Sequence, residues 1–317
     1  MARYLARRAL LLLPVMLGVT LVVFAMMHLA PGDPAVVMAG PRATPEILAE
    51  VRRYLGLDQP LVWQYMTWIA HAVQGDLGRS IRQGEQVTSL VLPRFQDSAM
   101  LGLTAFALAS VVGISLGVLS ALHRGSLLDQ AVMLVSMLGV STPAFFLGML
   151  LIVVFAFRWP ILPMSGLQNI NGPSGPLDIA RHLVLPAITL AAPSTTVIAR
   201  MVRASVMETV GLDYVRTARA KGMYERLVVN RHILKNALIP VVTLLGLQVG
   251  FLLGGAAIVE VVFSYPGIGN LMVKSIVERD LPVTQGCVLL IASVYVVVNI
   301  GADVVQAYLD PRIRVSA

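Results

Sequence analysis

Six long apolar stretches without a charged residue dominate this sequence. A helix needs about 20 consecutive apolar residues to cross the hydrocarbon core of a bilayer, so uncharged stretches of about 17 or more are candidates. The six are residues 9–29, 98–122, 130–157, 183–199, 236–259 and 281–302. Only 13% of the residues are charged, whereas soluble domains carry about 25%. The sequence therefore predicts an all-α, polytopic membrane protein with six transmembrane helices.

Two further uncharged stretches are excluded from the spans by their content. Residues 59–75 carry amide and imidazole side chains, and residues 159–177 hold four prolines, so both are predicted to lie outside the membrane. The shortest span, 183–199, also contains two prolines and is expected to continue past Arg200. The first span, 9–29, exceeds the apolar core of a signal peptide, which is about 7 to 15 residues long, and is predicted to be a retained helix.

The distribution of Lys and Arg predicts the orientation. With six spans both termini lie on one side, together with the loop that follows the fourth span, and this side holds 14 of the 24 basic residues. Because basic residues near span ends stay inside, both termini are predicted to be cytoplasmic. The net charge of +7 is therefore a topology signal, and we expect contact with membrane lipid and no nucleic-acid partner.

The first external loop, residues 30–97, is long enough to carry function. A helix is predicted over residues 45–55, with Thr44 as N-cap, Pro45 as its first residue and Gly56 as the C-terminal cap. Three aromatic residues that follow form either an interfacial aromatic belt or part of a docking face for an extracytoplasmic partner: Trp63, Tyr65 and Trp68.

The cytoplasmic loop, residues 201–238, contains a predicted short helix. Asp213 is a suitable N-cap for a helix that starts at Tyr214, and Gly222 can supply a left-handed C-terminal cap. Isolated helices of about two turns are marginal in water, so this one requires packing against another element. The loop offers a second amphipathic segment with apolar residues Leu227, Val228, Ile233, Leu234 and Leu238. The alternative is a basic surface helix on anionic lipid.

The sequence shows none of the residue patterns that are typical of a catalytic site. The sequence has no phosphate-binding loop, its five His residues show no metal-ligand spacing, and its single Cys287 permits no internal disulfide. We therefore predict no catalytic, cofactor or metal site. The spans carry neutral polar groups that either line a translocation path or hydrogen bond between helices. The candidates for the path are Ser141, Ser194, Thr195 and Gln248.

The predicted cytoplasmic loop holds a distinctive set of residues, namely Arg216, Thr217, Ala218, Arg219, Ala220, Lys221 and Gly222, followed by His232, Leu234, Asn236, Ala237 and Pro240. In these residues it resembles the coupling loop of ABC importer permeases in its dipeptide and oligopeptide form. Further similar stretches are residues 31–34 (PGDP), 55–61 (LGLDQPL), 75–78 (GDLG), 141–145 (STPAF), 246–260, 266–269 (PGIG) and 310–312 (DPR). Several of them resemble the glutathione permease branch.

One departure from the general Glu-Ala-Ala (EAA) loop pattern concerns its first residues. Aligned on Gly222, the Glu-Ala-Ala positions hold Arg216, Thr217 and Ala218, and the terminal Pro240 comes five residues late. The peptide-permease branch resembles this altered pattern. We therefore expect the loop to keep a docking role without Glu-mediated contacts.

The resemblance implies a type I ABC importer permease, with residues 1–317 as one permease domain in the bacterial inner membrane. It implies a second homologous permease, two ATPases that bind ATP and Mg²⁺, an extracytoplasmic peptide-binding protein and transport by alternating access. The chain itself is then not an enzyme. The implied coupling helix comprises Asp213, Tyr214, Arg216, Thr217, Ala218, Arg219, Ala220, Lys221 and Gly222. Cargo other than peptide, such as nickel or another small solute, stays open, as do an ion-coupled secondary transporter, a membrane enzyme and a scaffold.

Overall fold

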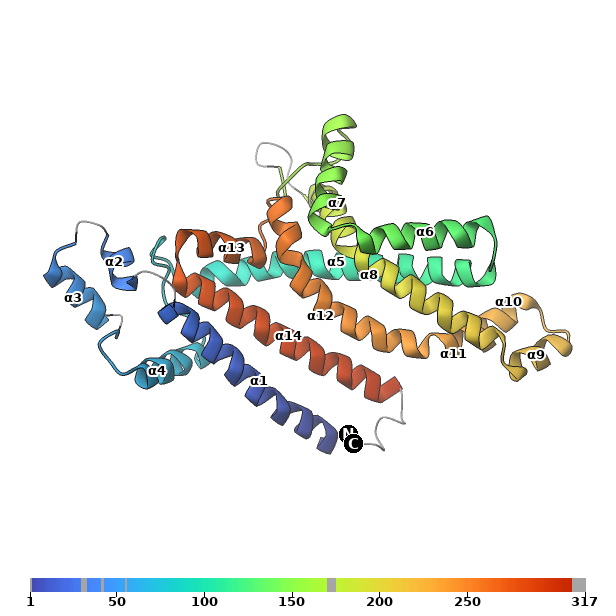
Figure 1. The fold of residues 1–317 in the computed structure, drawn as a ribbon, viewed down its shortest axis with the longest axis horizontal. Helices are drawn as coiled ribbons and strands as arrows, with labels where there is room; N and C mark the ends of the chain where they lie inside the picture. The colour runs from blue at the N-terminus through green and yellow to red at the C-terminus, as the bar shows by residue number, and fades with distance from the viewer. Residues whose placement is uncertain (1, 30–32, 41–42, 55, 170–174, 310–317) are drawn as a thin grey trace. The chain divides into compact units, whose positions relative to one another are not determined.

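The computed structural model describes residues 2–29, 33–40, 43–54, 56–169 and 175–309 (Figure 1). Its helices are α1 (Ala2–Leu29), α2 (Pro34–Ala39), α3 (Pro45–Tyr54), α4 (Leu61–Val73), α5 (Val87–Leu122), α6 (Leu127–Ser141), α7 (Ala144–Leu151), the π-helix η1 (Ile152–Arg158), α8 (Pro176–Val210), α9 (Asp213–Ala220), α10 (Glu225–Leu227), the π-helix η2 (Val228–Leu234), α11 (Lys235–Ala237), α12 (Ile239–Val262), α13 (Ile268–Glu278) and α14 (Leu281–Leu309). The described residues form no β-strand beyond an isolated bridge between Arg79 and Gln86. The predicted all-α class is confirmed.

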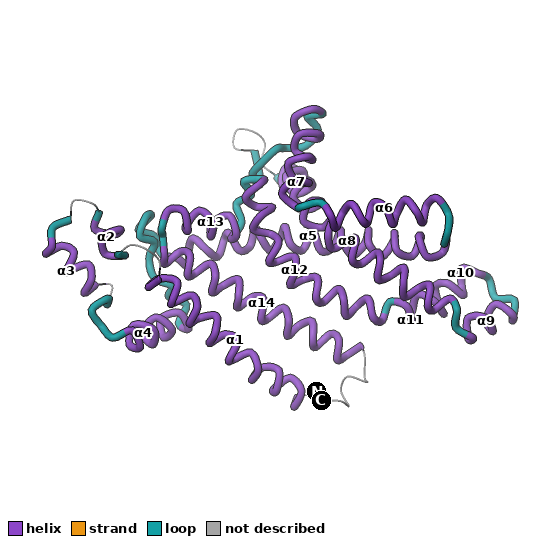
Figure 2. Tube along the Cα trace, in the orientation of Figure 1, coloured by secondary structure: helices purple, strands orange, loops and turns teal. Residues whose placement is uncertain are grey.

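The chain divides into two compact units. The first consists of Met1–Leu5, Ala99–Tyr265 and Val298–Ala317, and the second of Ala6–Ser98 and Pro266–Val297. The cytoplasmic loop predicted from the sequence belongs to the first unit, where short helices and turns follow α8 (Figure 2). The predicted external loop, residues 30–97, lies within the second unit.

Helices long and apolar enough to cross a membrane occur at most of the expected spans. Three pass this test on their own, namely α5, α8 and Leu281–Ala302 of α14. Two further pairs of helices pass the test together, each bent at a short break, and they bring the number to five if each pair is one span. The segment Pro14–Met26 in α1 is a shorter apolar helix. The membrane character of the chain is confirmed, and the total of six spans stays a prediction.

The third expected span, 130–157, is not one straight helix. The helices on either side of Thr142 and Pro143 are bent by 109°. Proline lacks an amide hydrogen and disfavours the helical region for the residue before it. Thr142 is accordingly extended, with φ −86° and ψ 120°. The prediction of a continuous span is corrected here, since the STPAF stretch divides it.

The fourth expected span, 183–199, is the middle of a much longer helix. α8 has 35 residues and continues past Arg200, which confirms the prediction from the sequence, despite Pro186 and Pro193 in its interior. It packs against α6, α7, α11 and α12 and supplies many of the buried apolar residues of the first unit. α8 is therefore the central helix of this unit.

Two glycines one turn apart on α5 allow it to approach α8 closely. A Cβ atom on Gly113 would lie 2.9 Å from the carbonyl oxygen of Thr195, and one on Gly117 would lie 2.6 Å from that of Ala199. This Gly-x-x-x-Gly spacing places both residues on one face of a helix, where small residues let membrane helices pack backbone to backbone.

In the second unit, the predicted helix 45–55 forms as α3 and ends at Tyr54, while Leu55 lies outside the described residues. Thr44 acts as the predicted cap, since its Oγ1 accepts from the amide of Ile47 at 3.5 Å, and Gly56 has the left-handed φ of 67°. Both capping predictions are confirmed. Of the other similar stretches, Pro31, Gly32 and residues 310–312 also lie outside the described residues.

Asp33 caps α2 and ties it to α3. Its Oδ1 accepts from the amide of Ala35 at 2.9 Å, and its Oδ2 accepts from Nε of Arg52 at 3.1 Å. The hydrogen bond from the Arg52 guanidinium holds the pKa of Asp33 below its usual value. The ion pair is largely exposed, so we expect it to orient the two short helices more than to stabilise them.

The GDLG stretch belongs to a turn that donates hydrogen bonds to the buried carboxylate of Asp280. Gly78 has φ 83° and donates its amide to Oδ1 of Asp76 at 2.9 Å. Asp280, just before α14, accepts the hydroxyl of Ser80 and the amide of Ile81. The turn is therefore fixed to the start of α14 within the second unit.

Two of the three aromatic residues after α3 hold α4 to α1. The Tyr65 hydroxyl lies 2.8 Å from Oγ1 of Thr20, and the rings of Tyr65 and Trp68 lie 5.4 and 6.2 Å from that of Phe24. Trp63 is 65% exposed. Its role as an interfacial anchor or as a docking residue stays open.

Candidate functional site

The predicted coupling helix forms as α9, but one residue earlier than expected. Leu212 is the N-cap and Asp213 is the first helical residue, with its carboxylate 3.5 Å from Arg216 in an exposed ion pair. The prediction of Asp213 as N-cap is therefore wrong. An Asp in the first helical turn still interacts favourably with the partial positive charge at the helix N-terminus.

The end of α9 matches the prediction. Gly222 has φ 73°, and its amide donates to the carbonyl oxygen of Arg219 at 2.9 Å. The amide of Met223 donates to the carbonyl oxygen of Ala218 at 3.4 Å. These two bonds across a left-handed residue are a Schellman motif, which satisfies carbonyl groups that the last helical turn leaves open.

The apolar face of α9 is covered by the chain itself. Val215 and Ala218 are three residues apart, so they share one face, and both are buried. They belong to the same apolar cluster as Val228 and Ile233 of η2, against which α9 packs. The requirement that a helix this short be held by packing is met within residues 201–238.

Burial limits what Ala218 can offer to a partner. Only 5% of the residue is exposed, so its side chain is not available for direct contact with a partner surface. The short side chain instead permits close packing of α9 on its own chain. A partner can therefore reach α9 through its other faces, which carry Tyr214, Arg216, Thr217, Arg219 and Ala220.

Polar contacts fix α9 to the following segment. The Tyr214 hydroxyl donates to the carbonyl oxygen of His232 at 3.2 Å and accepts from Nδ2 of Asn236 at 2.9 Å. Arg219 and Glu225 form a two-point ion pair, with Nε to Oε2 at 3.1 Å and Nη2 to Oε1 at 2.6 Å. This hydrogen bonding raises the pKa of Arg219 above its usual value.

The exposed surface around α9 is strongly basic. Exposed acidic residues of the same region are Glu208, Asp213 and Glu225. The exposed basic residues are Arg200, Arg216, Arg219, Lys221, Arg226, Arg231 and Lys235. A rigid, positively charged helix that projects beyond the C-terminal end of α8 suits docking of an acidic protein surface (Figure 1).

The candidate path residues do not form one site. Ser194 on α8 donates its hydroxyl to Oε1 of Gln248 on α12 at 3.1 Å, and both residues are buried. Thr195 donates to the carbonyl oxygen of Ala191 in its own helix at 2.9 Å. Ser141 is exposed at the end of α6. In this conformation Ser194 and Gln248 join two helices, and their role in translocation stays a prediction.

We expect Gln248→Leu and Ser194→Ala each to lower thermal stability slightly and to leave cargo preference unchanged. Hydrogen bonds between membrane helices contribute about 0.6 kcal/mol on average and at most about 1.7 kcal/mol. The double variant should lose little more than either single variant, because both remove one bond. Thermal unfolding and competition uptake measure these effects. A changed preference at unchanged stability would instead place Gln248 in the path.

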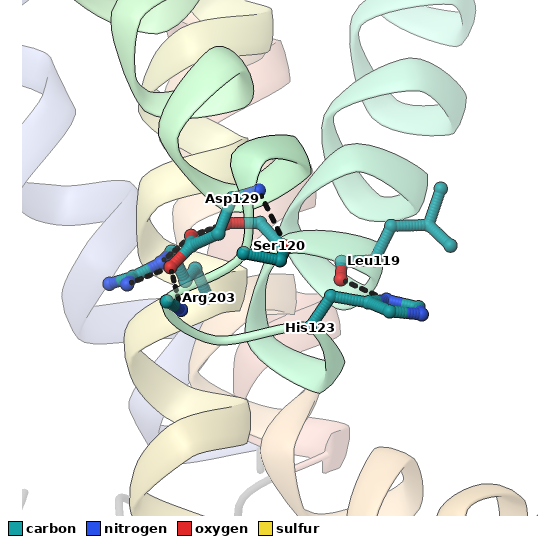
Figure 3. A network of polar contacts seen from close by, with 7 residues as sticks. Leu119, Ser120, His123, Asp129 and Arg203 are labelled. Atoms are coloured by element: carbon teal, nitrogen blue, oxygen red, sulfur yellow. Dashed lines mark hydrogen bonds and ion pairs between the residues drawn. The ribbon is translucent and has the colours of Figure 1, made fainter.

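A buried ion-pair network joins α5, α6 and α8 (Figure 3). Arg203 on α8 donates from Nε to Oδ1 of Asp129 at 2.8 Å and from Nη2 to Oδ2 at 2.9 Å. Asp129 also accepts the hydroxyl of Ser120 and the amide of Gly125, the latter at 2.9 Å. His123, in the turn after α5, bonds through Nδ1 to the carbonyl oxygen of Leu119. No local pattern could have paired Asp129 with Arg203, since 74 positions separate them.

Comparisons with known proteins agree with this architecture. Residues 113–315 match the family described as binding-protein-dependent transport system inner membrane component, and residues 1–101 match the N-terminal region of such components. Among solved structures, the inward-facing MetNI methionine ABC transporter has a TM-score of 0.56 at 18% identity, over 70% of this chain and 96% of that chain. An amino acid ABC transporter solved with histidines has a TM-score of 0.51 at 16% identity, over 71% and 94% of the two chains. These structures establish the similarity of fold.

Curated relatives match over nearly the whole length. The dipeptide transport system permease protein DppB of Escherichia coli K12 is 40% identical over 99% of both chains. The di/tripeptide permease DppB of Pseudomonas aeruginosa is 43% identical and the glutathione permease GsiC of Escherichia coli K12 is 42% identical, again over 99% of both chains. The chain belongs to the family of binding-protein-dependent transport system inner membrane components, the multi-pass permease subunits of ABC importers, which work with ATPase and substrate-binding partners.

Proposed function

We propose that this chain is the permease subunit of a peptide importer and that α9 is its coupling helix. The observation that carries the coupling role is the division of α9 into two faces. Val215 and Ala218 hold it to its own chain, while Arg216 and Thr217 stay exposed to a partner. Peptide cargo is supported by the names of the relatives, which are dipeptide, di/tripeptide and glutathione permeases.

The proposed complex contains this chain, a second homologous permease, two ATPases and an extracytoplasmic peptide-binding protein. ATP and Mg²⁺ bind to the ATPases, whose closure moves α9. Because α9 is packed on η2 and closed by a Schellman motif, its displacement passes to α8 as a rigid movement and is not lost in unfolding. The two permeases then open outward, receive the peptide and return after hydrolysis. Residues 30–97 form the external loop region and residues 201–238 the cytoplasmic coupling loop.

The transport assay tests this proposal directly. We expect the purified complex in proteoliposomes to import a dipeptide, a tripeptide or glutathione in the presence of ATP and the binding protein, and the chain alone to show background ATP hydrolysis only. A panel with free Ni²⁺ and single amino acids is the control. Uptake of Ni²⁺ without peptide uptake would overturn the assignment of peptide as cargo. Transport driven by an ion gradient without ATPases would overturn the assignment of the chain to an ATP-driven importer.

Orientation is a separate prediction. A reporter fused after Ala317 should behave as cytoplasmic, and one inserted near Gln83 should behave as external, because most basic residues flank the side with both termini. Paired phosphatase and fluorescent-protein fusions measure this. External activity of the fusion at Ala317 would contradict the six-span topology.

A further inference from the structure

The ion pair between Asp129 and Arg203 lies close to the coupling helix along the chain. Arg203 is on α8, seven residues before its last residue Val210, which corresponds to about two turns or ~10 Å. α9 then begins at Asp213. Asp129 is in the first turn of the neighbouring helix α6. The pair therefore joins the end of α8 that leads to α9 to a second membrane helix.

The geometry of the pair fixes both the relative orientation of the two side chains and the distance between them. Two nitrogens of one guanidinium bind two oxygens of one carboxylate, at 2.8 and 2.9 Å. Such a planar two-point contact resists rotation as well as separation, which a single lysine ammonium cannot do. The side chain of Asp129 is only 6% exposed, so solvent screens the contact weakly.

Asp129 is itself held from the other side. The Ser120 hydroxyl at the end of α5 donates to it (Figure 3), and so does the amide of Gly125 in the following turn. The amide of Asp129 in turn donates to Oγ of Ser126 at 3.2 Å, which caps α6. Arg203 thus binds a carboxylate whose position is fixed by contacts with α5, with the turn after α5 and with α6.

Close packing and the ion pair restrain α8 in different ways. Gly117 of α5 lies against Ala199 and Val202 of α8, and Gly139 of α6 lies against Thr196 of α8. Packing of this kind transmits movement between helices, although each van der Waals contact is itself non-directional. The ion pair adds a directional contact beside it.

We propose that Asp129 and Arg203 are positioning residues that couple α8 to α6, so that a displacement of α9 moves both helices together. This inference rests on the proposed coupling role of α9. Neither residue is proposed to contact ATP or cargo. The pair converts movement at the cytoplasmic surface into movement of the helix that leads, through the bend at Pro143, to α7.

The deciding measurement is the number of ATP molecules hydrolysed per peptide imported by the complete complex. We expect Arg203→Lys, which keeps the charge and loses the planar fork, to raise this number by about fivefold or more, within the usual range of coupling free energies. ATP hydrolysis should stay close to the wild-type rate. The matched control is Arg181→Lys, an exposed residue of the same helix outside the basic surface around α9, which should leave the ratio unchanged.

The charge-exchanged double variant, Asp129→Arg with Arg203→Asp, separates coupling from local packing. We expect Asp129→Asn to raise the ratio of ATP hydrolysed to peptide imported, and the double variant to bring this ratio part of the way back to the wild-type value. A parallel fall of ATP hydrolysis and uptake in Arg203→Lys, with an unchanged ratio, would overturn the coupling role and leave the proposed function intact. Failure of the unchanged complex to import any peptide would overturn the proposed function instead.

A distance measurement in a complex that keeps Asp129 and Arg203 does not depend on how variants of these two residues fold. Gln130 on α6 and Ala204 on α8 are exposed and can be replaced by Cys for spin labelling, with the buried Cys287 left in place. We expect the distance between the labels to be the same in the resting complex and with a non-hydrolysable ATP analogue. A change between the two states would show that α6 and α8 move independently and would overturn the proposal.

Discussion

Gly117→Val is expected to prevent the first unit from folding to its native packing. A Cβ atom at this position would lie 2.6 Å from the carbonyl oxygen of Ala199 and 2.6 Å from Cβ of Val202. The first of these is a backbone atom that cannot rotate away, so α5 and α8 must separate. Overpacking typically lowers the free energy of unfolding by about 1 to 3 kcal/mol. We expect the upper end of this range, because valine adds a Cβ atom with two methyl groups against a helix backbone. Yield of monodisperse protein, thermal unfolding and peptide uptake should all fall.

The matched control for this prediction is Gly102→Val. It lies on the same helix, carries the same substitution and has nothing within 4 Å of an added Cβ. Gly117→Ala should fall between the two variants, because it adds the Cβ alone. Equal yield, stability and uptake of Gly117→Val and Gly102→Val would contradict the close packing of α5 on α8.

Ala218→Trp is expected to displace α9 and to abolish ATPase association and uptake together. Ala218 is buried beside Val215 in the apolar cluster that includes Val228 and Ile233, so an indole cannot be accommodated without moving α9 away from η2. The helix has eight residues and is marginal without that packing. Membrane insertion should persist, because no span is touched. Co-purification of the ATPases, uptake and limited proteolysis of the loop measure the effect.

Ala220→Trp is the control on the exposed part of the same helix. It adds the same side chain without overfilling the cluster, so the loop should stay resistant to protease even if partner binding weakens. Normal protease resistance and normal transport of Ala218→Trp would contradict the internal packing of α9. Loss of membrane insertion in Ala218→Trp would show that the loop is required for folding and not only for coupling.

Features that depend on neighbouring residues could be predicted from the sequence. The left-handed cap at Gly222 and the cap at Thr44 follow from residue type and spacing of a few positions, and both are present in the structure. The short helix α9 and its need for packing followed from the same local arguments. The start of α9 was wrong by one residue, because Leu212 adopts the extended cap conformation and Asp213 enters the helix.

The sequence by itself determined the membrane character, the all-α class and the place of the short helix α9, because hydrophobic length and capping are properties of contiguous residues. Only the tertiary structure decided that Ala218 faces its own chain, that Ser194 bonds to Gln248 and that Arg203 bonds to Asp129. These partners are 54 and 74 positions apart, and a side chain's type does not specify which distant side chain it meets. That choice depends on how the helices pack, which the close approach at Gly113 and Gly117 sets for α5 and α8.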